Sequence, residues 1–575
     1  MNIFARSKLF IPSVLVPALQ SQIILFYGFL LSLGVSYFYL FINDPNYPIE
    51  NPNVMWLGVV MSLGCVLLGT LISKNKTTKK KLNLGEGAVA ICLVWFIACS
   101  ISSFVFMYAG FPIPDRVAEF GLFRQYIDGF YESMSGFTTT GTSILPSVEV
   151  FSRSLLFWRS LTHWIGGMGI AYMALTIFSH FFTRRAEIIN SEAESPHIMN
   201  FKDEKEAVAS GVDFLKAYVV MSIICTVLLI ISGFYFRQVP YDHWYTNVFD
   251  SLTMMFGTLG TGGFGVYNAS VGLPIEEAGK MVIGGLRNPV SEWIITVFML
   301  FSAMNFGLWF VLIFKKNIKS MFKNMEFRAF WAFVLITGFG IAYILYSLGV
   351  HTTIESSLRY AFFNVATIIS TTGYANDNFA LWPVAAQGLL FASYLVGACV
   401  GSTGGGLKFT RFLVMFKYIG IQIKNMIHGK HETNFSIDGV TYNDRSTGLI
   451  LTNIVLYYLI FLFGAIFIMM SSSQIAFVDG TTKDLDFVGA LTASIANLGN
   501  IGPALVDGNA GVGPTGNYSA FTTLTKILMS LLMFIGRVGV LTAIMILFIR
   551  EENDKVSDNI AHVDFDSDAP YVIGK

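Results

Sequence analysis

The sequence Thr139-Thr140-Gly141-Thr142 recurs in altered form at three later points of the chain. The other copies are Thr261-Gly262-Gly263-Phe264, Thr371-Thr372-Gly373-Tyr374 and Asn497-Leu498-Gly499-Asn500. A segment that returns at similar spacing indicates internal repeats. Four such segments could surround a dehydrated cation with backbone carbonyl oxygens, and glycine tolerates the positive φ that this geometry requires. We therefore interpret the four copies as the four quarters of one pore.

The composition indicates a membrane protein. Hydrophobic residues make up 54% of the 575 residues, charged residues 13%, and the mean hydropathy is +0.60. Soluble domains typically carry about 25% charged residues. The net charge is zero, which gives no sign of nucleic-acid binding. All five cysteines lie in apolar stretches, so we expect packing roles and no disulfides.

Apolar runs predict ten membrane-spanning segments. They lie near residues 14–43, 55–73, 87–110, 154–182, 214–236, 290–314, 329–348, 386–420, 446–471 and 521–549. Between paired spans lie four stretches too short to cross, at 124–140, 246–260, 356–370 and 485–496. Each repeat is therefore a span, a re-entrant half-helix, a filter segment and a second span. Because every repeat crosses twice, all four share one orientation, unlike the inverted repeats of many transporters.

The expected fold is an all-α integral membrane protein with four pseudo-symmetric repeats around one pore. Two extra transmembrane helices occupy residues 1–83, and their first span is too long for a cleaved signal peptide. The division of the rest is 84–200 for repeat 1, 201–320 for repeat 2, 321–435 for repeat 3 with an intramembrane gate loop, 436–550 for repeat 4 and 551–575 for a cytoplasmic tail.

Basic residues predict the orientation of the chain. They gather after even-numbered spans, at Lys74, Lys76, Lys79, Lys80 and Lys81, at Arg184 and Arg185, and at Lys315, Lys316, Lys319, Lys323 and Arg328. Since cytoplasmic loops collect Lys and Arg, both termini should face the cytoplasm and the filters should face outward. Asp377 and Asp507, after the third and fourth filters, predict a mildly acidic outer vestibule.

Four motifs resemble the Trk/Ktr/HKT superfamily of potassium transporters. GFTTTG at 136–141 and HWIGGMG at 163–169 are similar to the first repeat of that family, and GSTGGGLK at 401–408 and GRVG at 536–539 are similar to its gate elements. The two extra spans favour the bacterial TrkH type over the shorter KtrB type. The resemblance implies potassium uptake across the bacterial cytoplasmic membrane, with potassium as the transported ion and no organic cofactor. It also implies a homodimer with one pore per subunit and a cytoplasmic nucleotide-binding regulatory ring of TrkA type.

A glycine-rich break and one arginine form the predicted gate. The gate residues are Gly401, Ser402, Thr403, Gly404, Gly405, Gly406 and Arg537. A midspan arginine costs about 2.5–3.5 kcal/mol on insertion scales, so Arg537 should face the protein interior. We expect its guanidinium to donate hydrogen bonds to loop carbonyls and to oppose cation passage. The alternative of a phosphate-binding loop fails, because that pattern needs Lys followed by Ser or Thr directly after Gly406, and this chain has Leu407-Lys408.

Carboxylates near the half-helices have predicted structural roles. Asp128, Asp250 and Asp486 each lie thirteen residues before their glycine, and we expect them to cap the half-helices. Glu132 should hydrogen-bond the filter backbone, with direct ion coordination as the less favoured alternative. Asn497 stands where the other copies have Thr, which predicts mixed backbone and side-chain ligation at the innermost ring.

Alternative functions remain on the sequence alone. A sodium-permeable HKT-like transporter is the first, although sodium-preferring members of the family tend to carry Ser at the first filter glycine. A membrane enzyme is the second, but the eight histidines show no metal-ligand spacing. A membrane scaffold would leave the four filters unexplained. The sequence leaves open whether transport is channel-like or coupled to protons or sodium.

Overall fold

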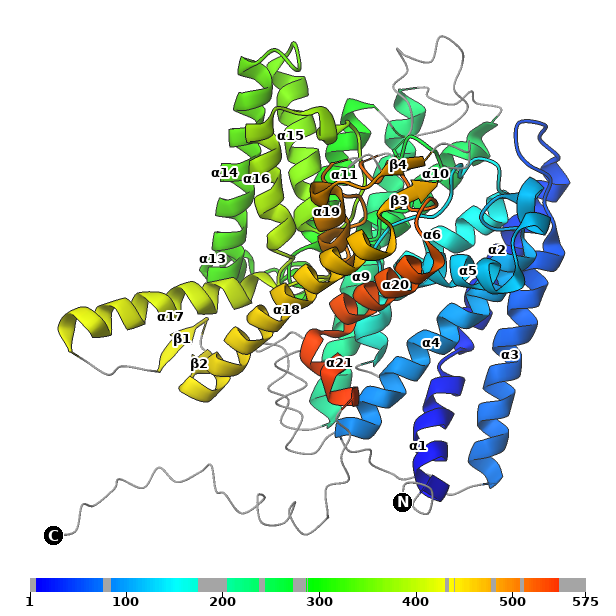
Figure 1. The fold of residues 1–575 in the computed structure, drawn as a ribbon, viewed down its shortest axis with the longest axis horizontal. Helices are drawn as coiled ribbons and strands as arrows, with labels where there is room; N and C mark the ends of the chain where they lie inside the picture. Colours follow the sequence, from blue (N-terminus) through cyan, green and yellow to red (C-terminus); the bar gives the residue numbers. More distant parts are fainter. Residues whose placement is uncertain are drawn as a thin grey trace.

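The computed structural model describes residues 7–75, 84–173, 204–236, 243–271, 286, 288–429, 434–438, 440–476, 482–506, 511–514 and 516–547 (Figure 1). Several residues named above lie outside these ranges: Lys76, Lys79, Lys80, Lys81, Arg184, Arg185, Asp507 and the tail at 551–575. Six helices of the described part are long and apolar enough to cross a membrane, and a bent helix pair brings the number to seven.

Two spans precede the repeats, as predicted. Helices α1 (Ser7–Gln20) and α2 (Ile23–Ile42) together give one apolar span from Val14 to Ile42, and α3 (Pro52–Asn75) gives the second. Asn43 ends α2 in the left-handed conformation, with φ 50°, and its N–H donates to the carbonyl of Tyr39. Helix α2 packs on α3 and α6, which places these spans at one edge of the molecule (Figure 1).

Each repeat has a long helix, a short helix and a second helix. Repeat 1 consists of α4 (Leu84–Tyr108), α5 (Leu122–Phe137) and α6 (Arg153–Met173), and repeat 2 of α9 (Glu204–Tyr235), α10 (Trp244–Gly260), α11 (Pro289–Ser302) and α12 (Phe306–Lys315). After α13 (Ile318–Lys323), repeat 3 consists of α14 (Met325–Ser347), α15 (Ile354–Ile369), α16 (Val384–Leu395) and α17 (Phe409–His428). Repeat 4 consists of α18 (Asp444–Ser471), α19 (Phe487–Leu498), α20 (Thr523–Val538) and α21 (Val540–Leu547).

The short helices close the repeats into a ring. Each packs on the long helix of its own repeat, since α5 contacts α4, α10 contacts α9, α15 contacts α14 and α19 contacts α18. Each also packs on the second helix of the preceding repeat, since α10 contacts α6, α15 contacts α11, α19 contacts α16 and α5 contacts α20. The last of these contacts joins repeat 4 to repeat 1. The predicted four-repeat arrangement is therefore confirmed.

The second helices of repeats 2, 3 and 4 are interrupted. The break in repeat 3, between Leu395 and Phe409, falls on the predicted glycine-rich loop. The prediction of continuous spans at 290–314 and 521–549 is wrong, because each of them contains a break. Helices α11 and α12 meet at 105°, because the Asn305 side chain accepts the N–H of Gly307 at 2.8 Å and starts a new helix. Gly539, with φ 97°, separates α20 from α21.

Two small antiparallel hairpins add to the expected all-α fold. Strands β1 (Phe435–Ile437) and β2 (Val440–Tyr442) lie between α17 and α18, and β3 (Gln474–Ala476) pairs with β4 (Thr482–Asp484) before α19. The first hairpin packs on α17, which extends away from the other helices (Figure 1). Its Asp438 carboxylate accepts the N–H groups of Met325 and Glu326 and thereby holds the start of α14.

Buried ion pairs join three of the four seams between repeats. Each connects a second helix to the short helix of the next repeat. The pairs are Arg153 with Asp250 at 3.9 Å, Glu292 with Arg359, and Lys526 with Asp128 at 2.7 Å. Removing one partner of such a pair leaves an uncompensated buried charge, which costs far more than the pair itself contributes. The pairs therefore specify which helix faces which across each seam.

This finding corrects two of the three capping predictions. Asp486 does cap α19, because its side chain accepts the N–H of Gly489 at 2.6 Å. Asp128 and Asp250 lie inside their helices, whose N-cap residues are Gly121 and His243. Their carboxylates face the preceding repeat instead, because α5 and α10 begin further upstream than the spacing suggested.

Asp128→Leu tests the seam between repeats 4 and 1. The change leaves the ammonium of Lys526, whose side chain is 1% exposed, without its carboxylate. We expect a destabilisation of about 3–5 kcal/mol, seen as a lower thermal midpoint in detergent micelles. The double variant Asp128→Leu with Lys526→Met should recover most of that loss. An unchanged midpoint for Asp128→Leu alone would contradict the structural role of this pair.

Candidate cation pore

The four short helices end in the same backbone turn. After the last helical turn, one residue adopts the left-handed conformation: Thr139 (φ 55°), Thr261 (φ 53°), Thr371 (φ 59°) and Asn500 (φ 52°). The next N–H donates to the carbonyl five residues back, in the pairs Thr140–Ser135, Gly262–Gly257, Thr372–Thr367 and Ile501–Ala496, at 2.8–2.9 Å. This is the Schellman motif, which satisfies carbonyls that a helix end would otherwise leave without partners.

Threonine at three of these positions is unusual. A β-branched residue with positive φ is a backbone outlier, and such strain costs on the order of 1–3 kcal/mol for each residue. Three equivalent outliers at the ends of buried helices are therefore held in place by the surrounding structure. Strain of this kind is concentrated at functional sites, so these turns mark the candidate site.

Glycines two residues after each turn meet in a closed ring. Gly141, Gly263, Gly373 and Gly502 have φ between 79° and 105°. A Cβ built on each would meet a carbonyl oxygen of the next repeat: Gly141 that of Gly262 at 2.0 Å, Gly263 that of Thr372 at 2.0 Å, Gly373 that of Ile501 at 2.2 Å, and Gly502 that of Thr140 at 2.8 Å. The last contact returns to repeat 1. Both the backbone conformation and the close approach therefore require glycine.

The ring corrects the assignment in repeat 4. Its equivalent segment is Asn500-Ile501-Gly502, three residues later than predicted. Gly499 has φ −78° and ends α19, whereas Gly502 occupies the ring. Asn497 lies in the last turn of α19, where its side chain donates to the carbonyl of Ala493 and accepts from the hydroxyl of Tyr131. The predicted side-chain ligation by Asn497 is therefore wrong, and Leu498 is likewise a buried helical residue.

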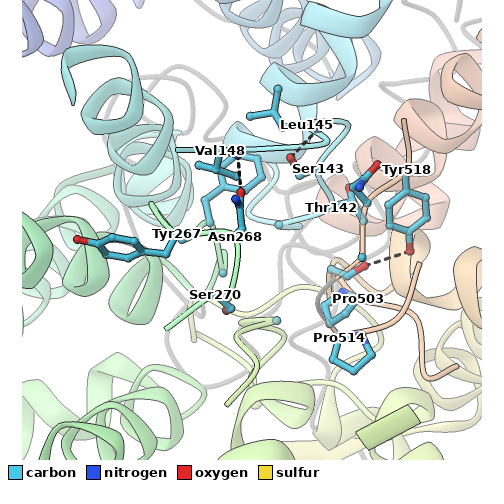
Figure 2. Close-up of a pocket in the computed structure, with 18 of the residues that line it drawn as sticks. Thr142, Ser143, Leu145, Val148, Tyr267, Asn268, Ser270, Pro503, Pro514 and Tyr518 are labelled. Atoms are coloured by element: carbon cyan, nitrogen blue, oxygen red, sulfur yellow. Dashed lines mark hydrogen bonds between the residues drawn. The ribbon is translucent and has the colours of Figure 1, made fainter. Parts of the chain in front are cut away.

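All four ring glycines line one cavity of about 110 Å³ (Figure 2). Thr142, Phe264 and Pro503, which follow three of the glycines, also line it, whereas Tyr374 does not belong to the lining. The Tyr374 side chain instead donates to the carbonyl of Met254 at 3.1 Å. Figure 2 shows Tyr518 beside the segment after Gly502, and its hydroxyl donates to the Gly502 carbonyl at 3.2 Å. No pattern in the sequence marks this tyrosine.

A buried carboxylate supports the segment after the first glycine. Glu132 accepts the N–H of Ile144 at 2.9 Å and the hydroxyl of Ser143 at 3.0 Å. Its other contact is Arg159, whose Nε lies 2.7 Å away and whose Nη1 donates to the carbonyl of Gly265. The predicted hydrogen bond to the filter backbone is therefore displaced, because Glu132 bonds the backbone at Ile144, two residues past the predicted filter segment. Arg159 also connects it to repeat 2.

The cavity differs from the predicted acidic vestibule. Among the described residues that line it, the charged side chain is Arg159. Asp377 lies outside the lining and accepts from His351 at 2.9 Å and from the indole of Trp382 at 2.8 Å. Burial by itself would raise the pKa of the Asp377 carboxyl, but these two hydrogen bonds hold that pKa below its ordinary value. The carboxylate is thus bound by two loops of repeat 3, the one before α15 and its own.

The glycine-rich loop between α16 and α17 packs directly against the segments that form the ring. Gly405 donates its N–H to the Thr371 hydroxyl at 2.8 Å, and a Cβ on Gly405 would lie 2.6 Å from the Asn500 side chain. The loop also pairs with the break between α11 and α12, since Phe306 donates to the carbonyl of Gly401 and Cys399 to that of Ala303, both at 2.9 Å. The predicted gate residues 401–406 are thus held against the turns that follow the short helices of repeats 3 and 4, and against a second broken helix.

Arg537 makes the predicted contact with this loop. It is 8% exposed and lies in the last turn of α20, immediately before the break at Gly539. Its guanidinium donates to the carbonyl of Thr403 at 2.6 Å and to that of Gly166, in α6, at 2.8 Å. One side chain therefore joins repeats 4, 3 and 1.

These features define a polytopic membrane protein with a single pathway built from four repeats. Residues 121–559 match the model of the TrkH family, described as cation transport proteins, and the chain belongs to this family. The family places the chain among transporters, not enzymes.

Relatives extend over most of the chain. The Trk system potassium uptake protein TrkH of Salmonella typhimurium is 26% identical over 488 residues, which cover 85% of this chain and 89% of that protein. TrkH of Halomonas elongata is 26% identical over 502 residues, covering 86% and 91%. The crystal structure of the potassium transporter TrkH from Vibrio parahaemolyticus has the same fold, with a TM-score of 0.71 at 21% identity over 93% of this chain and 99% of that one.

The revised assignment in repeat 4 can be tested with two alanine variants. Gly502→Ala should weaken cation selectivity about as much as Gly373→Ala, because each places a Cβ at positive φ against a neighbouring repeat. Gly499→Ala should weaken selectivity less than Gly502→Ala, because its right-handed φ suits alanine, although its Cβ would lie 2.8 Å from the Ile495 carbonyl oxygen and 2.9 Å from the Ile501 side chain, so that these groups must shift. Competition between cations in uptake assays provides the measurement. Loss of selectivity in Gly499→Ala alone would restore the original assignment.

Proposed function

We propose that this protein carries potassium into the cell through the ring formed by Gly141, Gly263, Gly373 and Gly502. The closed ring carries the proposal, because it brings backbone carbonyls from all four repeats to one place. Carbonyl oxygens at such a constriction can replace the hydration shell of a potassium ion. Similarity to Trk system potassium uptake proteins supports potassium as the substrate.

The proposed filter comprises three residues from each repeat. They are Thr139, Thr140 and Gly141, then Thr261, Gly262 and Gly263, then Thr371, Thr372 and Gly373, and finally Asn500, Ile501 and Gly502. Helices α5, α10, α15 and α19 end at these residues, so the negative ends of their dipoles favour a cation there. Glycine at all four ring positions gives no support to the sodium-permeable alternative.

Gly141→Ser tests this function. The hydroxymethyl group would meet the carbonyl of Gly262 and force the first filter segment to shift. The preference of the protein for potassium over sodium should therefore fall. Proteoliposomes with defined potassium and sodium gradients measure this preference directly, with Gly388→Ser in α16 as the matched control, because nothing lies within 4 Å of the Cβ built there. The same assay with imposed proton or sodium gradients separates channel-like from coupled transport. An unchanged preference in Gly141→Ser would contradict the filter assignment.

We propose that the loop 401–406 and Arg537 form a closed gate below this filter. The contact between the Arg537 guanidinium and the Thr403 carbonyl supports it, since a fixed positive charge in the pathway opposes cations. A glycine-broken loop can move without the cost of unwinding a regular helix.

Arg537→Ala should raise potassium flux without changing the preference for potassium over sodium, because the filter lies on the outer side of the gate. Deletion within Gly404, Gly405 and Gly406 should act similarly. The combined variant should add little to either one, because both remove the same barrier. Lower flux in Arg537→Ala at unchanged protein abundance would contradict a barrier role.

We further propose a bacterial cytoplasmic-membrane location with both termini in the cytoplasm, together with the division of the chain at residues 83, 200, 320, 435 and 550. Lys74 and the exposed group Lys315, Lys316, Lys319 and Lys323 support this orientation.

The proposed assembly is a homodimer bound to a cytoplasmic nucleotide-binding ring of TrkA type, and the name "Trk system" of the relatives supports separate components. Co-purification from native membranes tests both partners.

A further inference from the structure

Repeat 2 differs from repeats 1 and 3 at one filter position. Thr140 and Thr372 occupy this position in repeats 1 and 3, and their hydroxyls bond the hydroxyls of Thr138 at 2.8 Å and Ser370 at 2.7 Å. Repeat 2 has Gly262, which provides no such bond. The φ of Gly262 is not in the positive region, so backbone conformation does not explain the glycine.

The side chain of His163 explains it. A Cβ built on Gly262 would lie 2.1 Å from Cγ of His163, so the imidazole occupies the space that a threonine would need. His163 belongs to α6 of repeat 1 and is fully buried. Its ring also packs against that of Phe264, with centroids 4.2 Å apart. A side chain of repeat 1 thus supports the filter segment of repeat 2 from behind.

Two hydrogen bonds fix the imidazole. Nδ1 lies 2.8 Å from the carbonyl oxygen of Gly136, and Nε2 lies 3.1 Å from the backbone nitrogen of Phe264. A carbonyl can only accept and an amide N–H can only donate. His163 is therefore neutral, with its proton on Nδ1, and it joins the end of α5 to the residue after Gly263.

The second bond controls a carbonyl of the proposed filter. In a planar trans peptide the C=O and N–H groups point in opposite directions. The Phe264 N–H belongs to the same peptide unit as the Gly263 carbonyl. Because His163 accepts this N–H, the Gly263 carbonyl points away from His163. Gly263 lines the cavity, whereas His163 does not belong to its lining.

We propose that His163 is a positioning residue that sets cation selectivity, by supplying to repeat 2 the volume and the hydrogen bond that Gly262 lacks. The proposal rests on the potassium filter proposed above. It makes His163 and Gly262 a matched pair, because changing either residue alone should lower cation selectivity.

Two substitutions of His163 separate hydrogen bonding from packing. His163→Leu fills the space without any polar group, and we expect the potassium-to-sodium preference in proteoliposomes to fall about tenfold, as expected for one lost hydrogen bond. His163→Gln, whose amide can both donate and accept, should retain most of the preference. Preference retained in His163→Leu would reduce His163 to a packing residue and overturn the proposal.

A compensation experiment tests the matched pair. Gly262→Thr should lower both preference and flux, because the threonine meets the imidazole. His163→Ala with Gly262→Thr should perform better than Gly262→Thr alone, since the threonine can then occupy the vacated space as in repeats 1 and 3. A double variant no better than Gly262→Thr would overturn the pairing, and this comparison holds even if His163→Ala alone fails to accumulate.

Gly141→Ser serves as the reference in the same assay. If it changes ion preference while the His163 and Gly262 variants do not, the role of His163 is refuted and the filter assignment stands. If none of these variants changes ion preference, the filter assignment itself is refuted.

Discussion

The structure depends on one constraint: irregular backbone within a membrane must find its hydrogen-bond partners inside the protein. The four short helices stop in the middle of the bundle, and each stop would leave carbonyl groups without partners. In each repeat a Schellman turn supplies hydrogen-bond partners for these carbonyl groups. The turn also reverses the chain so that the following glycine meets the next repeat. The requirement that allows the helices to end therefore also creates the ring of carbonyls.

Contacts between repeats also hold this ring. Buried ion pairs fix three seams, and at the fourth the Tyr394 hydroxyl donates to the carbonyl of Pro503 at 3.0 Å. Arg159 connects the first filter segment to Gly265, and the Asn500 amide donates to the Thr140 hydroxyl. Loop 401–406 and Arg537 attach to the same elements from below. The proposed filter and the proposed gate therefore share one framework.

Local signals predicted the number of repeats, the half-helices, the broken helix in repeat 3 and the contact of Arg537 with its loop. The register of repeat 4 could not be read, because 497–502 offers Asn-Leu-Gly and Asn-Ile-Gly three residues apart. Only the position where α19 ends decides between them. The role of Asp128 was also hidden, since its partner Lys526 lies almost 400 residues away. The break after Ser302 depends on a cap by Asn305, which an apolar span does not reveal.

The presence of all four quarters on one chain has a consequence for how such a filter can change over time. In a channel made of four identical subunits, a change from threonine to the pair of glycine and histidine would occur at all four interfaces at once. Here one seam carries His163 against Gly262, whereas repeats 1 and 3 keep a threonine at this filter position whose hydroxyl bonds a residue of its own repeat. Repeats encoded in one gene can therefore diverge in sequence one interface at a time, provided that the adjacent repeat acquires a compensating substitution.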